Sequence, residues 1–120
     1  MSVRTNLLAA GLMAAMTSAA HSQTPTPGLS AKGEGPWKVT CQVIADGDPK
    51  TVILEAGAER FSHRRLTGGS CDYRAASRGD LTILLEGAEA CPFPGATAAC
   101  SLKAASGQTG SFKFAIRRGR

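Results

Sequence analysis

Hydrophobic and polar residues alternate along residues 37–45, WKVTCQVIA, which is the pattern of a strand with one buried face. The odd positions carry Trp, Val, Cys, Val and Ala, and the even positions include Lys, Thr and Gln. The next four residues, DGDP at 46–49, combine the residue types that favour a turn. The segment therefore predicts a half-buried strand that ends in a turn.

The same alternation, less regular in places, recurs behind turn signals along the rest of the chain. We expect further strands at residues 51–55, 59–66, 70–75, 81–86, 100–104 and 111–118. About seven short strands, with a turn signal about every 8–12 residues, are typical of an antiparallel sandwich or small barrel. The predicted fold class is all-β, a small antiparallel sandwich or barrel of about seven strands stapled by disulfides.

The first 22 residues have the layout of a secretory signal peptide. Arg4 is followed by an apolar run of about ten residues and then by small residues, a length too short to span a membrane. Cleavage after Ala20 and cleavage after Ser22 both place small residues at the required positions. We therefore expect a periplasmic or secreted protein of a bacterium, without a transmembrane segment.

Residues 23–36, QTPTPGLSAKGEGP, contain three prolines and three glycines and little apolar surface. Such a composition predicts a flexible linker. Residues 37–120 then form a single β domain with a thin core, because small domains bury a low fraction of their surface.

Four cysteines, an even number behind a predicted signal peptide, indicate a disulfide framework. Cys41 and Cys71 lie on the apolar sides of their strands, and Cys91 and Cys100 flank the short segment PFPGATAA. We favour the pairs 41–71 and 91–100, although four cysteines allow three connectivities. By reducing the entropy of the unfolded chain, the 41–71 bridge would stabilise the fold by about 3.7 kcal/mol and the 91–100 bridge by about 2.7 kcal/mol. These values are a large part of the total stability of a small domain.

The sequence carries no known catalytic pattern, so we expect no enzyme and no cofactor. It lacks the C-x2-C pairs of zinc sites and the C-x-x-C of redox sites. His63 is the only histidine in the domain, and its neighbour Ser62 points to the opposite face of a strand, so the two cannot act as a base and a nucleophile. We expect His63 at a strand surface or edge. A less favoured alternative is copper binding by His21, as a mature N-terminus, together with His63.

Candidate contact residues come from charge and from one aromatic. The chain has 14 basic and 9 acidic residues, a formal net charge of +5. The basic clusters Arg64–Arg65 and Arg117–Arg118 favour anionic partners. Phe93, between two prolines in the Cys91–Cys100 loop, is either a rigid apolar anchor for a partner or part of the core. Specific nucleic-acid binding is not expected, because the aromatics alternate into strands instead of forming a stacking surface.

These observations favour a secreted, non-catalytic β module that acts by binding or by a structural role at the cell envelope. Its expected partner is an unidentified protein or an anionic envelope polymer. The alternative is a small inhibitor of a secreted hydrolase, because stapled domains with rigid loops suit that task. The segment WKVTC, residues 37–41, resembles the first strand of the invasion-associated locus B family of secreted proteins. The resemblance covers five residues, and no residue role is carried over from it.

Overall fold

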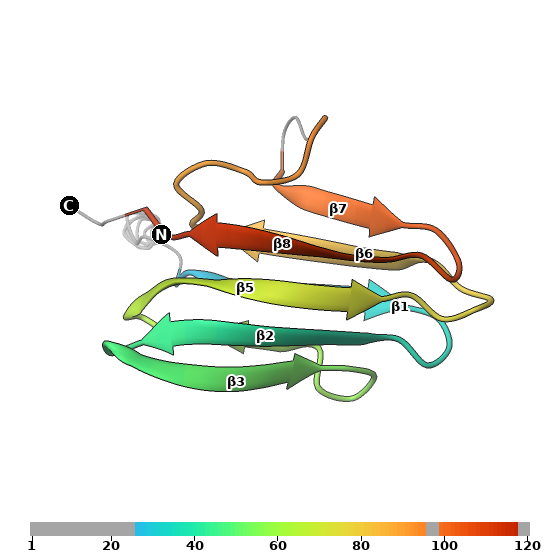
Figure 1. The fold of residues 1–120 in the computed structure, drawn as a ribbon, viewed down its shortest axis with the longest axis horizontal. Coiled ribbons are helices and arrows are strands. Elements are labelled where there is room, and N and C mark those ends of the chain that lie inside the picture. Colours follow the sequence, from blue (N-terminus) through green and yellow to red (C-terminus); the bar gives the residue numbers. More distant parts are fainter. Residues whose placement is uncertain (1–25, 96–98, 118–120) are drawn as a thin grey trace, which may run out of the picture.

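Two antiparallel sheets pack face to face in the computed structural model, which describes residues 26–95 and 99–117. Sheet A has the strand order β4-β1-β6-β7, and sheet B, in front of it in Figure 1, has the order β3-β2-β5-β8. The predicted signal peptide, His21 and Arg118 lie outside the described residues. The strands are β1 (Gly28–Gly33), β2 (Lys38–Ala45), β3 (Asp48–Leu54), β4 (Arg60–Ser62), β5 (Leu66–Arg74), β6 (Leu81–Glu86), β7 (Ser101–Ala104) and β8 (Thr109–Ala115).

The core lies between the two sheets and is built from the alternating apolar positions that the sequence shows. Val39, Cys41 and Val43 of β2 and Leu81 and Ile83 of β6 belong to this core, and all five are fully buried. No polar or charged residue of the described segments is buried. The prediction of an all-β, sandwich-like, disulfide-stapled fold is confirmed.

The β2–β3 hairpin has a two-residue turn, shorter than the four-residue turn that the sequence predicts. Asp46 and Gly47 both have positive φ angles, 56° and 79°, and Ala45 pairs directly with Asp48. A two-residue hairpin loop with positive φ at both positions matches the right-handed twist of its strands, and Asp-Gly is a preferred sequence for it. Strand β3 therefore begins before Pro49 and not after it.

Residues 28–33 form a central strand of sheet A, so the prediction of a flexible linker over residues 23–36 is wrong for this segment. β1 pairs with β6 along its whole length and with β4 on its other side. Leu29 and Ala31 are buried, at 2% and 4% exposure. Gly28 allows β4 to come close, because a Cβ there would meet the Phe61 carbonyl oxygen. Neighbouring strands thus stabilise a segment whose own composition is that of a linker.

Replacing Leu29 by alanine is expected to lower the free energy of unfolding by about 2–3 kcal/mol, because it removes a fully buried side chain from the core. Denaturant titration measures this change. Ser30→Ala, a change on the outer face of the same strand, is expected to stay within about 0.5 kcal/mol. Equal, small effects of both substitutions would show that residues 28–33 behave as a linker.

The predicted strand at residues 59–66 is shortened to β4, and its last residue, Leu66, belongs to β5, the strand predicted at 70–75; the eighth strand, beyond the seven predicted, is β1. β4 keeps only three residues, and the amide of Leu66 donates a hydrogen bond to the His63 carbonyl in the turn that follows (3.1 Å). Leu66 then starts β5 in the other sheet. Regular alternation ends at His63 because the chain crosses from sheet A to sheet B there.

Both disulfides have the predicted pairing. Cys41 and Cys71 lie directly opposite each other on β2 and β5, with Cα atoms 4.0 Å apart, so this bridge joins neighbouring strands of one sheet. Cys91 and Cys100, with Cα atoms 5.5 Å apart, close the connection between β6 and β7. One bridge is therefore inside the core, and the other fastens a loop.

Candidate functional site

The outer face of sheet B carries a shallow depression with a volume of about 450 Å³ near the ends of β2 and β5. Two rows of residues run across strands β2, β5 and β8 there, and antiparallel pairing sets both rows (Figure 1). We call these six residues the basic depression. One row is Lys38, Arg74 and Thr109, and the next is Thr40, Asp72 and Ser111.

Lys38 and Arg74 are the two cations of the basic depression, and they lie directly opposite each other on neighbouring strands. Both side chains are exposed, and within the described residues neither makes an ion pair with a carboxylate. Like charges at directly opposite strand positions destabilise a sheet. An anionic group bound between them would remove that repulsion.

Tyr73 and Gly110 form one wall of the basic depression. Tyr73 points to the inner side of sheet B and is 9% exposed, and its ring crosses the paired Gly110 toward the edge of the sheet. A Cβ at position 110 would meet the Tyr73 hydroxyl, so any larger residue here would have to displace the Tyr73 ring. The glycine thereby leaves room for the Tyr73 ring on the inner side of sheet B, beneath the basic depression.

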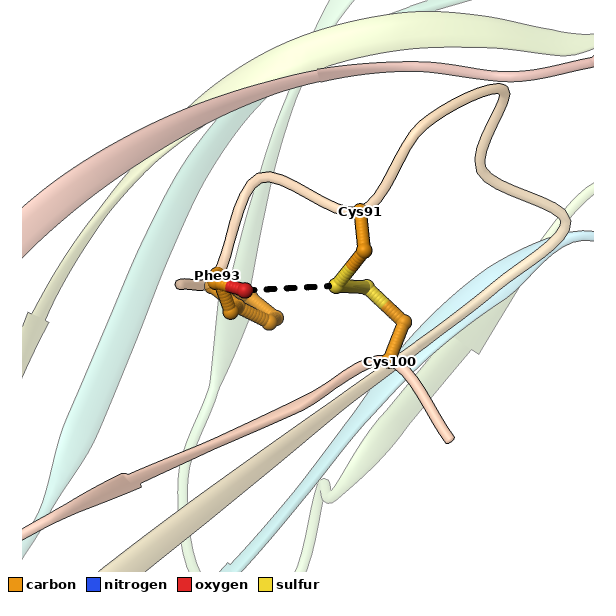
Figure 2. The surroundings of a disulfide bond; sticks show 3 residues. All are labelled: Cys91, Phe93 and Cys100. Carbon is orange, nitrogen blue, oxygen red and sulfur yellow. Dashed lines mark hydrogen bonds between the residues drawn. A yellow bond between two sulfur atoms is a disulfide. The ribbon is translucent and has the colours of Figure 1, made fainter. Parts of the chain in front are cut away.

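Phe93 belongs to the core, so it is not available as an exposed partner contact. It is 5% exposed and meets the Phe112 ring edge-on, with ring centroids 4.8 Å apart. Figure 2 shows its carbonyl oxygen directed at the Cys91–Cys100 bridge, 4.0 Å from the Cys91 sulfur. This is a packing contact, because a disulfide sulfur has no proton to donate. A loop residue is buried here because the loop covers the core beside β8.

Arg64, Arg65 and Arg117 are exposed at the other end of the sandwich from the basic depression. The Arg65 Nε atom lies 3.4 Å from an Asp46 carboxylate oxygen, so part of its charge is neutralised. The amide of Arg117 donates a hydrogen bond to the Gly87 carbonyl (2.8 Å). The structure thus leaves Arg64 and Arg117 exposed to solvent and pairs Arg65 with a carboxylate.

His63 lies in the turn after β4, beside Phe61 and Asp46. Its Nδ1 atom accepts a hydrogen bond from the Arg65 amide at 3.0 Å, and its Nε2 atom is 4.0 Å from an Asp46 oxygen. This arrangement positions the turn and includes no nucleophile. Within residues 26–95 and 99–117, no three His, Cys, Asp or Glu side chains are grouped so that they could hold a metal ion.

The sequence places Lys38, Arg74 and Asp72 on the polar sides of their strands, but it does not bring them together. Their meeting depends on β2 pairing with β5 in one particular register, and a period-two pattern contains no information on which strands are neighbours.

Comparison of the chain with models of known families, with curated proteins and with solved structures yields no match. The described part of the chain contains no helix, and therefore none that is long and apolar enough to cross a membrane.

Proposed function

We propose that the protein is a secreted, non-catalytic binding module that holds an anionic polymer of the cell envelope at the basic depression. The observation that carries the proposal is the pair Lys38 and Arg74, directly opposite each other, exposed, and without an ion pair among the described residues. The hydroxyls of Thr40, Thr109 and Ser111 surround the pair and supply further hydrogen-bonding groups.

Two further features support a secreted protein and a charged partner. The two disulfides favour an oxidising compartment, as does the signal-like sequence at the N-terminus. The aromatic side chains of the described residues are buried or half-buried, which removes the exposed rings on which a neutral sugar or a base would stack. The outer face of sheet B can therefore bind a ligand through its charged side chains and its hydroxyl groups.

The double substitution K38Q/R74Q is expected to weaken binding of polygalacturonate roughly tenfold at low salt, because it removes two charge-assisted contacts. The dependence of log K on log salt concentration should become shallower by about 1.4–1.8 units, about 0.7–0.9 for each cation removed. Isothermal titration at several salt concentrations measures both quantities.

The matched control is K32Q/R60Q, which removes one lysine and one arginine from the outer face of sheet A. If the two double variants lose affinity equally, binding depends only on the net charge of the protein and the proposal is wrong. Asp72→Asn should act in the opposite direction and tighten binding, because it removes the one carboxylate of the basic depression.

A further inference from the structure

Three exposed cations, Arg74, Lys113 and Arg117, follow the seam between β5 and β8, whereas Lys38 lies on β2. Alternate residues of β8 face outward, and these are Thr109, Ser111, Lys113 and Ala115. Arg117 follows two residues later in the same alternation and is exposed. Arg74, on the neighbouring strand β5, pairs with Thr109 at one end, so basic groups lie level with positions 109, 113 and 117 of β8 and its continuation.

The spacing of these basic groups is regular. Four residues of an extended strand cover about 13 Å, so the line from Thr109 to Arg117 is about 26 Å long. Lys113 and Arg117 are exposed, and within the described residues neither forms an ion pair with a carboxylate. A ligand that contacts all three positions therefore has to be an extended chain with acidic groups along its length.

Apart from Asp72, which pairs with Ser111, the residues between the cations are small, which leaves the seam between β5 and β8 low enough for such a chain. The outward positions of β5 that pair with Lys113 and Ala115 are Ser70 and Gly68. The outward residues of β8 between the cations are Ser111 and Ala115. The exposed isoleucines of this face, Ile44 and Ile53, lie on β2 and β3, with Ile44 directly opposite Gly68 and one strand outside the seam.

We infer that the β5–β8 seam is the binding track of a linear acidic polysaccharide, which lies lengthwise from the basic depression to Arg117. The inference rests on the proposed function and adds the ligand class and its direction on the sheet. An acidic polysaccharide fits better than a single-stranded nucleic acid, because the seam has no exposed aromatic ring on which bases would stack. It also fits better than an anionic membrane, because the cations form a line and the exposed isoleucines lie outside it.

The test is a length series of oligogalacturonates, from the dimer upward, titrated against the full mature chain. Affinity should rise with length until the oligomer spans the track, and it should then level off. K113Q/R117Q should remove most of that gain, about tenfold for the longest oligomers, while the affinity for the dimer stays unchanged. K32Q/R60Q is again the matched control, and circular dichroism verifies that each variant is folded.

The outcomes separate the two proposals. Affinity independent of length, or equal losses in K113Q/R117Q and the control, overturns the track, while a selective loss in K38Q/R74Q keeps the basic depression as a site for short anions. Absence of binding to every oligomer overturns both. Tighter binding to a single-stranded oligonucleotide or to anionic phospholipid vesicles at the same salt concentration overturns the assignment to a polysaccharide.

Discussion

Replacing Cys41 and Cys71 together by alanine is expected to lower the free energy of unfolding by about 4 kcal/mol. The two residues are 30 positions apart in sequence, and a crosslink over such a loop contributes about 3.7 kcal/mol by restricting the unfolded chain. Both side chains are buried, at 0% and 2% exposure, so the alanines also lose packing in the core. A small domain rarely has more than about 5–15 kcal/mol in total, so this variant should be close to unfolding at 37 °C.

Equilibrium denaturation in guanidinium chloride measures the effect, with Cys91→Ala/Cys100→Ala as the comparison. The second bridge closes a separation of 9 residues, and its removal should cost less, about 2.7 kcal/mol by the same relation. An unchanged denaturation midpoint for the Cys41 and Cys71 variant would show that the bridge contributes little. A larger effect for the surface bridge would contradict the central position that the structure gives to Cys41 and Cys71.

Replacing Phe93 by alanine should lower the free energy of unfolding by about 3 kcal/mol. Phenylalanine removed from a core costs about 3–5 kcal/mol, and a loop that can settle into the space favours the lower value. The ring also loses its edge-on contact with Phe112. Pro94→Ala, at the exposed neighbouring position, should change stability by less than about 0.5 kcal/mol. If Phe93 were an exposed anchor, its substitution would be as mild as that of Pro94.

A double-mutant cycle links Phe93 to the bridge beside it. Once Cys91 and Cys100 are replaced, the loop is free to withdraw the ring from the core, so Phe93→Ala should then cost clearly less than in the bridged protein. Strict additivity of the two changes would mean that the disulfide does not hold the ring in place. The cycle therefore tests whether the loop fastens the core beside β8, the strand on which the track depends.

Particular residues show how far the sequence carries the candidate site. The alternation in residues 37–45 puts Lys38 on the polar side of a strand, and the structure confirms that orientation. The basic clusters at Arg64–Arg65 and Arg117 stand out in the sequence, yet Arg65 is paired with Asp46 while Lys38 and Arg74 have no such partner among the described residues. Clustering along the chain is therefore a poor guide to unneutralised charge, because strand pairing decides which charges meet.

By itself the sequence determined the fold class and most of the inward-facing positions, because these follow from local alternation, and its spacing favoured the observed pairing of the cysteines among three possible ones. Only the tertiary structure decided that residues 28–33 form a strand, since Leu29 and Ala31 are too few to indicate one without the neighbours β4 and β6. It also decided that Phe93 is buried and that Lys38 meets Arg74. Each of these depends on contacts between segments distant in sequence, and a local pattern does not encode them.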